Sequence, residues 1–134
     1  MAATSKDLIV CVVDDDEAVR DSTQMLLGIH GFKVQVYAGA KDFLAEFDAA
    51  ITGCLILDIH MPEMTGVELL SLLRARGIAT PAIVVSGQTD PVLGQILTRS
   101  GALAILSKPV NEDELMGYVE KALTFSSQPS GLNR

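Results

Sequence analysis

Acidic side chains gather where the first apolar stretch of the chain ends, in the sequence VVDDDE (12–17). Neighbouring carboxylates repel one another, by about 1 kcal/mol per pair at 4 Å in water and by more where the dielectric constant is lower. Three successive aspartates, Asp14, Asp15 and Asp16, therefore mark either the solvated start of a helix or carboxylates that share a cation. A later apolar stretch also ends in an acid, Asp58.

Two more apolar stretches end in polar groups of a different kind. Ser86 closes the stretch AIVVS (82–86), and Lys108 follows shortly after LAIL (103–106). In an open sheet of parallel strands, ligands bind beyond the carboxyl ends of the strands. If these stretches are parallel strands, carboxylates, a hydroxyl and an ammonium meet at one edge of the sheet.

The charges at this edge indicate a divalent cation. Ionised Asp14, Asp15 and Asp58 carry three negative charges; Lys108 neutralises one of them, and a single Mg²⁺ neutralises the remainder. A hydroxyl and an ammonium, such as Ser86 and Lys108, suit the oxygens of a phosphoryl group that the metal does not bind. Phosphoryl transfer also needs an in-line nucleophile, and a carboxylate can be that nucleophile. We take Asp58 as the nucleophile, because it stands alone at the end of a central stretch.

Five short apolar stretches alternate with segments of helical character. Four of the stretches are almost continuously apolar, which is typical of parallel strands buried on both faces, whereas residues 33–37 alternate and are placed at a sheet edge. The predicted strands are 8–13, 33–37, 54–57, 82–86 and 103–106. The predicted helices are 17–30, 39–47, 65–75, 91–100 and 111–125. This alternation predicts a (βα)5 fold, an open α/β sheet with helices on both faces.

Polar residues at the predicted helix starts support these boundaries. Thr65 and Asn111 stand at N-cap positions of their helices. Asp16 and Glu17 suit the start of helix 17–30, where the helix dipole favours acids, better than they suit a metal site. The predicted apolar side of that helix consists of Val19, Leu26, Leu27 and Ile29.

The composition predicts one folded domain. The chain has 134 residues, 49% hydrophobic and 20% charged, which excludes global disorder. Its net charge of −7 argues against sequence-independent binding to nucleic acid or anionic lipid. No apolar stretch approaches the ~20 residues of a membrane span, and the start MAATSKD lacks the apolar region of a signal peptide. We interpret Cys11 and Cys54 as reduced core thiols of a cytoplasmic protein, with a disulfide or metal role as the alternative.

Four motifs together resemble the receiver domains of bacterial two-component response regulators. They are VVDDDEAVR (12–20), LILDIHMPEMTGVELL (55–70), AIVVSGQTD (82–90) and LSKPVNEDEL (106–115). The resemblance covers residues 8–124 and is greatest to receivers that precede helix-turn-helix output domains. It implies a CheY-like fold with strand order 2-1-3-4-5, a receiver domain in 1–126, and a flexible polar tail or linker in 127–134. The sequence fits a stand-alone receiver and a receiver excised from a longer response regulator equally well.

Carried over by position, the resemblance implies a role for each residue of the acidic edge. Asp58 resembles the phosphoacceptor, which takes a phosphoryl group from a histidine kinase or a phosphotransfer protein. Asp15 would bind Mg²⁺ directly and Asp14 through water. The phosphoacceptor itself and the backbone carbonyl of His60 would be further ligands. Ser86 resembles the switch hydroxyl that moves to bind the phosphoryl group. The only catalysis implied is the protein's own phosphorylation and dephosphorylation.

The end of the fifth strand both follows and departs from the family. Lys108 resembles the lysine that contacts the phosphoryl group, and the family implies a cis peptide bond between Lys108 and Pro109. Ile105, however, stands at the usual aromatic switch position, so aromatic rotation is not the readout here. Ala104 stands where relatives often carry an acid.

The resemblance also implies a partner surface on the fourth helix, the fifth strand and the fifth helix. Leu93, Ile96 and Leu97 lie at helical spacing, and they are either core contacts or partly exposed. If exposed, they form with Ala104 and Ile105 an apolar face for a downstream protein or a second copy of the chain. Burial of both Ile96 and Ile105 would exclude that hypothesis. The domain itself is expected to bind neither nucleic acid nor membrane.

Three other functions compete with the phosphorylated switch. A receiver-fold module that never uses phosphate is opposed by the complete set of acidic, hydroxyl and lysine positions. A metal-dependent phosphohydrolase would need a second acid two residues after Asp58, and that position is His60. A flavin carrier is disfavoured because acids follow the first strand, where they would repel a phosphate.

Overall fold

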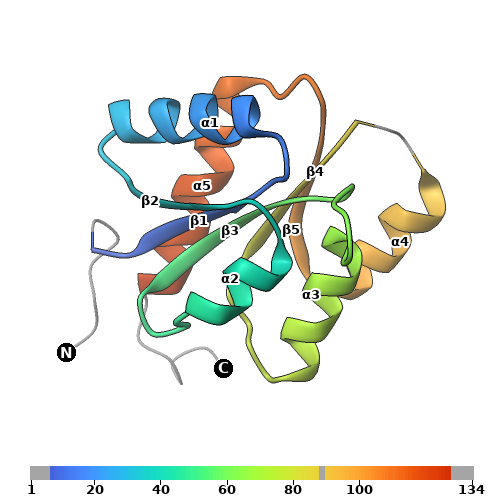
Figure 1. Cartoon of the computed structure of the whole chain (residues 1–134). Coiled ribbons are helices and arrows are strands. Elements are labelled where there is room, and N and C mark those ends of the chain that lie inside the picture. Colours follow the sequence, from blue (N-terminus) through green and yellow to red (C-terminus); the bar gives the residue numbers. More distant parts are fainter. Residues whose placement is uncertain (1–6, 88–89, 128–134) are drawn as a thin grey trace.

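Five parallel strands form one sheet in the order β2-β1-β3-β4-β5 in the computed structural model, which describes residues 7–87 and 90–127 (Figure 1). The predicted fold class and strand order are confirmed, and the alternating strand β2 lies at an edge. The central strand β3 is buried along its whole length and extends beyond the predicted 54–57. The strands are β1 (Ile9–Val13), β2 (Lys33–Tyr37), β3 (Thr52–Asp58), β4 (Ala82–Ser86) and β5 (Ala102–Ser107).

Helices cover both faces of the sheet (Figure 1). Helices α1 and α5 pack on one face, and α2, α3 and α4 pack on the other. The helices are α1 (Glu17–Ile29), α2 (Ala40–Glu46), α3 (Gly66–Ala75), α4 (Pro91–Arg99) and α5 (Glu112–Ser127). None of these helices has both the length and the hydropathy of a membrane span.

Successive side chains of each strand point to opposite faces of the sheet, so the core consists of two layers. Val10 and Val12 of β1 face the α1/α5 layer, whereas Cys11 and Val13 face the layer of α2, α3 and α4. Because successive side chains of a strand point to opposite faces, both faces of the central strands must be apolar. Cys11 and Cys54 are free and buried, as the interpretation as core thiols requires.

The predicted N-caps are confirmed. The Thr65 hydroxyl accepts from the backbone N–H of Glu68, whose carboxylate accepts from the Thr65 N–H in return. Asn111 accepts from the N–H of Glu114, and Asp16 accepts from the first N–H groups of α1. Asp16 is therefore a helix cap, as expected.

Two details of the helices differ from the prediction. Helix α5 continues through Ser127, so the polar tail does not begin at 127; the Ser126 hydroxyl donates to the carbonyl of Gly53 at 2.7 Å and holds the last turn on β3. The rest of the tail, 128–134, lies outside the described residues. Ile29, predicted on the apolar side of α1, is 76% exposed, because it lies on the opposite side of the helix from the fully buried Leu27.

Candidate functional site

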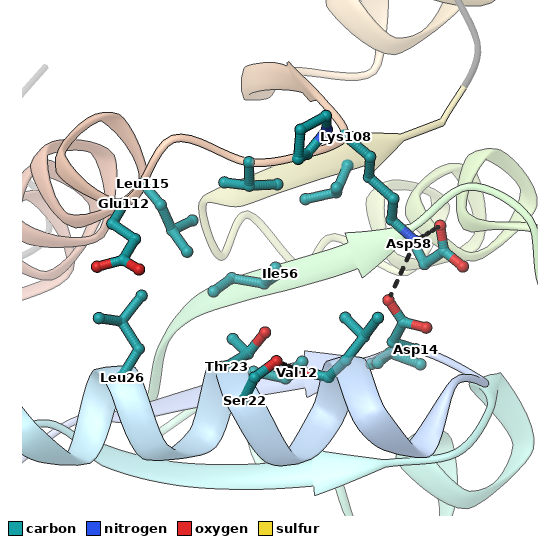
Figure 2. Close-up of a pocket in the computed structure, with 15 residues that line it drawn as sticks. Val12, Asp14, Ser22, Thr23, Leu26, Ile56, Asp58, Lys108, Glu112 and Leu115 are labelled. Atoms are coloured by element: carbon teal, nitrogen blue, oxygen red, sulfur yellow. Dashed lines mark hydrogen bonds and ion pairs between the residues drawn. The ribbon is translucent and has the colours of Figure 1, made fainter.

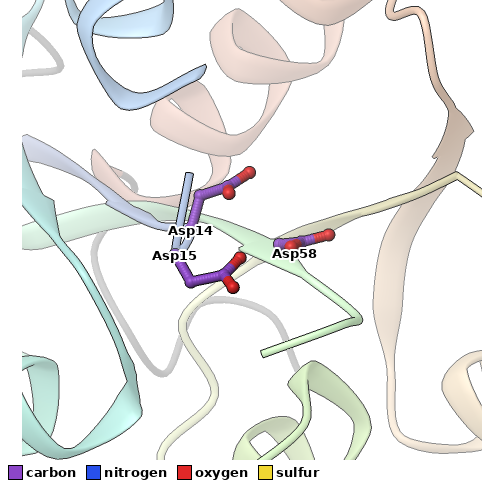
Figure 3. A group of neighbouring side chains, drawn as sticks. All are labelled: Asp14, Asp15 and Asp58. Carbon is purple, nitrogen blue, oxygen red and sulfur yellow. The ribbon is translucent and has the colours of Figure 1, made fainter. Parts of the chain in front are cut away.

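Three carboxylates meet at the carboxyl edge of the sheet, at the ends of its two central strands (Figure 3). Val13 of β1 pairs with Leu57 of β3, so Asp14 and Asp58, which follow these residues, lie side by side. Asp14 and Asp58 are only 4% and 5% exposed, whereas Asp15 faces solvent. One oxygen from each of the three carboxylates lies within 4.8 Å of the others.

A lysine that directly follows β5 completes this cluster (Figure 2). The Nζ of Lys108 lies 3.4 Å from Asp58 Oδ1 and 3.6 Å from Asp14 Oδ2. Its backbone N–H donates to the carbonyl of Ser86 at 2.8 Å, which ties the end of β5 to the end of β4. The peptide bond between Lys108 and Pro109 is cis, as predicted. We call Asp14, Asp15, Asp58 and Lys108 the acidic site.

Backbone groups hold the two buried carboxylates in place. The N–H of Asp16 donates to Asp14 Oδ1 at 2.9 Å, and the His60 backbone N–H donates to the Asp58 carboxylate. Arg20 donates to the backbone carbonyl of Asp14 at 2.8 Å. The His60 side chain is exposed.

The electrostatics of the site favour a bound cation. Burial, and then the charge of Asp14, raise the pKa of Asp58 above its usual value, against the opposing effect of Lys108. Burial alone would lower the pKa of Lys108, but the charges of Asp14 and Asp58 raise it. One ammonium thus neutralises two buried carboxylates only in part.

The donor set fits Mg²⁺. This ion takes oxygen ligands, usually one or two protein carboxylates with water and phosphate oxygens completing the shell. The acidic site offers carboxylate oxygens on one side and solvent on the other, because Asp15 is exposed. There is no sulfur or imidazole in the cluster that would favour a transition metal.

Gly66, which the sequence-based prediction missed, lets α3 approach the site. A Cβ at this position would lie 2.4 Å from the backbone oxygen of Asp58, too close for any side chain. The Gly66 N–H donates to the carbonyl of Ile59 at 3.0 Å and fixes this approach. A glycine directly after an N-cap, where better helix formers are available, was the signal in the sequence.

Ser86 lies between the acidic site and the predicted partner surface. It is buried at the end of β4 and lines a cavity of about 250 Å³ together with Leu93 and Ile105. This cavity therefore connects the predicted switch hydroxyl with α4 and β5.

Part of the apolar surface predicted to bind a partner is exposed. Ile96 is 38% exposed and Ile105 is 41% exposed, whereas Leu97 is buried. Leu93 and Ala104 are half-buried. We call Leu93, Ile96, Ala104 and Ile105 the α4–β5–α5 face. The structure leaves two large aliphatic side chains in water on this face.

Known proteins are similar to this chain in sequence and in fold. A sequence profile of the response regulator receiver domain matches residues 10–120. The response regulator protein TodT of Pseudomonas putida is 33% identical over 120 residues, which cover 90% of this chain and 53% of TodT. The transcriptional regulatory protein FixJ of Bradyrhizobium diazoefficiens is 34% identical over 114 residues, covering 85% of this chain and 56% of FixJ.

A solved structure of the response regulator StyR aligns with a TM-score of 0.85 and 33% identity, covering 90% of this chain and 61% of StyR. The chain spans about half the length of the curated relatives it matches. The strand order and the acidic edge define a CheY-like receiver. The chain belongs to the response regulator receiver family of two-component signalling.

Proposed function

We propose that Asp58 accepts a phosphoryl group from the phosphohistidine of a sensor kinase or phosphotransfer protein. The observation that carries this proposal is the acidic site itself. A buried carboxylate at the end of the central strand lies 3.4 Å from an ammonium and beside two further carboxylates. The protein's two cysteines, Cys11 and Cys54, form no disulfide, which supports a cytoplasmic location for the phosphoryl transfer.

The transfer exchanges one bond to phosphorus for another. An oxygen of Asp58 attacks the phosphorus atom, an O–P bond forms, and the N–P bond of the phosphohistidine breaks. The imidazole leaves with the electron pair of that bond and takes a proton from solvent. Asp14, Asp15, Asp58 and the His60 carbonyl would hold Mg²⁺, which supplies positive charge for the phosphoryl oxygens.

Lys108 assists by charge and position. In the resting protein its Nζ contacts both buried carboxylates, so it already lies where phosphoryl oxygens would arrive. A fixed ammonium stabilises the charge that spreads over these oxygens during transfer, without reorganisation of solvent. We propose no turnover of other substrates: the protein acts on its own aspartate, and the acyl phosphate is later hydrolysed.

The phosphoryl group changes the molecule through Ser86. It adds close to two negative charges at Asp58, and a nearby hydroxyl is drawn toward its oxygens. Movement of Ser86 would alter the cavity that it shares with Leu93 and Ile105. The α4–β5–α5 face would then bind a downstream protein or a second copy of the chain. FixJ, a relative, is named as a transcriptional regulatory protein.

A second candidate is a module that binds its partner without phosphorylation. It is favoured by the exposure of Ile96 and Ile105, which leaves an apolar surface open to a partner. With no aromatic side chain at position 105, the face has no bulky group whose rotation would hide or reveal it.

Intact mass spectrometry separates the two candidates. The protein is incubated with Mg²⁺ and acetyl phosphate, beside the Asp58→Asn variant and the Asp16→Asn variant as a matched control. Wild type and Asp16→Asn should each gain one phosphoryl group, the gain should disappear with EDTA, and Asp58→Asn should gain none. If wild type gains nothing here or with a cognate kinase, phosphorylation is excluded and the phosphate-independent module remains.

A further inference from the structure

A second feature of the α1/α5 layer is an open cavity of about 300 Å³ beside the acidic site (Figure 2). It lies between α1 and the segment that joins β5 to α5. Its floor is apolar and comes from the central strands, and its walls come from the two helices. The apolar lining residues are Val12, Val13, Val19, Leu26, Ile56, Val85, Pro109, Val110 and Leu115.

The two ends of the cavity carry charge. Asp14, Asp58 and Lys108 stand at one end, and Glu112 stands at the other, where its carboxylate points toward Leu26 (Figure 2). Three carboxylates against one ammonium leave the lining with an excess of negative charge. Lys108 is engaged with the two aspartates, whereas Glu112 has no ion pair within residues 7–87 and 90–127.

This lining selects the class of ligand. Pockets for small ligands have volumes of roughly 300–1,000 Å³, apolar walls and a few polar groups that set orientation. An anionic ligand would meet uncompensated carboxylates, and a purely polar ligand would leave Ile56 of the floor and Leu115 of the α5 wall without apolar contacts. A cation at the aspartate end would compete with Lys108 and with the metal, so Glu112 is the free anchor.

We propose that this cavity binds a small amphipathic cation, with its ammonium at Glu112 and its aryl or alkyl body over Ile56 and Leu115. Thr23 and Val110 also line the cavity. The ligand and the phosphoryl group occupy neighbouring sites, so both can be bound at once. The inference stands on the cavity and its charges, and does not depend on phosphorylation of Asp58.

Binding is tested by NMR with three probes of one shape and different charge. The probes are 4-phenylbutylammonium, 4-phenylbutan-1-ol and 4-phenylbutanoate, each titrated into the ¹⁵N-labelled protein in saturating Mg²⁺. The ammonium should give saturable shifts at the amides of Val19, Thr23, Ile56 and Val110. Its dissociation constant should be at least tenfold below that of the carboxylate, with the alcohol between them.

Two variants locate the ligand. Glu112→Gln should weaken binding of the ammonium about threefold, as removal of an exposed charge partner does, and leave the alcohol unaffected. Glu114→Gln, which removes another acid of the same helix turn outside the cavity, should change neither. Val110→Phe should fill the cavity and abolish binding of all three probes, while labelling by acetyl phosphate persists as a check on folding.

Several results would overturn the proposal. They are the absence of saturable shifts, equal affinity for the ammonium and the carboxylate, and equal effects of Glu112→Gln and Glu114→Gln. Ammonium binding that is seen with EDTA but lost in Mg²⁺ would also overturn it, because the cation would then occupy the metal site. Because Glu112 is exposed, Glu112→Gln should fold. The comparison of Glu112→Gln with Glu114→Gln therefore tests the proposal even if Val110→Phe fails to fold.

Discussion

The acidic site and the α4–β5–α5 face lie on either side of Ser86, yet they are built in opposite ways. Asp14 and Asp58 are almost fully buried and are held by backbone N–H groups and by Lys108. Ile96 and Ile105 are more than a third exposed. A site that binds a charged ligand needs its polar groups in place before the ligand binds. Burying a carboxylate without a hydrogen-bond or charge partner would cost too much free energy. An apolar face can remain open until a partner covers it.

The largest difference in stability between the two regions is expected when a glycine is replaced by alanine, at Gly66 beside the acidic site and at Gly94 in α4. In Gly66→Ala the new Cβ would clash with the backbone oxygen of Asp58, so α3 must move away from the end of β3. We expect a loss of about 3 kcal/mol or more in the free energy of unfolding, and slower labelling by acetyl phosphate. Urea denaturation and intact mass would measure the two effects.

Gly94→Ala in α4 is the matched control. A Cβ there would meet nothing within 4 Å, and alanine favours a helix over glycine by roughly 0.5–1 kcal/mol. Gly94→Ala should therefore be neutral or stabilising. Equal losses for the two variants would show that the close approach of α3 to the site is wrong.

A second large effect is expected at Arg74, which anchors the far end of α4. The guanidinium is half-buried and donates four hydrogen bonds at 2.8 to 3.2 Å. Arg74→Met should cost about 2 kcal/mol, because the carbonyl groups lose charged donors, whereas exposed Arg76→Met should change little. Thermal unfolding of both variants checks this. The four acceptors are the carbonyl oxygens of Ile78, Thr80, Ser100 and Gly101.

A smaller effect of opposite sign is expected within the acidic site. Asp58→Asn removes a buried charge that repels Asp14, so in EDTA the variant should be more stable than wild type by about 1 kcal/mol at neutral pH. Asp58 has a raised pKa in the folded protein, so it binds its proton more tightly there than in the unfolded chain. Its protonated form favours folding, and stability is lost as pH rises through the folded pKa.

The advantage of Asp58→Asn should therefore vanish in acid and grow toward neutral pH. Urea denaturation in EDTA across this range measures it, and Mg²⁺ should stabilise wild type more than the variant. An advantage that grows instead as pH falls would contradict the assigned repulsion between the two carboxylates.

The smallest effect is expected on the α4–β5–α5 face. Ile96→Gln should change the free energy of unfolding by no more than about 0.5 kcal/mol and leave labelling of Asp58 unchanged. The neighbouring Leu97 is fully buried, and Leu97→Ala should cost about 2–5 kcal/mol. If Ile96→Gln destabilised the protein as much as Leu97→Ala, the face would belong to the core.

The acidic site could be predicted from the sequence because it depends on strand ends. Apolar stretches that end near Asp14, Asp58 and Lys108 need only be parallel strands of one sheet for the charges to come to one edge. Strands β1 and β3 are neighbours there, and the long side chain of Lys108 reaches both carboxylates from beyond β4. Gly66 was missed because a glycine after an N-cap indicates only that something approaches closely, and that its neighbour is the backbone of Asp58 is known only from the tertiary structure.

Exposure was harder to predict than position. Leu97 and Ile96 are neighbours of similar hydrophobicity, but only Leu97 points into the core. Ile29 was expected to be covered and lies instead in water, because the side of α1 that faces the sheet is centred on Leu27 and Ile29 lies nearly opposite it. The cavity between α1 and α5 likewise depends on the tertiary distance between two helices far apart in sequence.

The most direct test of the account is to locate the phosphoryl group chemically. After incubation with acetyl phosphate and Mg²⁺, borohydride reduces an aspartyl phosphate to homoserine, and peptide sequencing by mass spectrometry finds the modified position. We predict homoserine at position 58 alone, and none when EDTA replaces Mg²⁺. Homoserine at position 14 or 15 instead of 58, or labelling that is indifferent to Mg²⁺, would contradict the assignment of Asp58 as the phosphoacceptor of the acidic site.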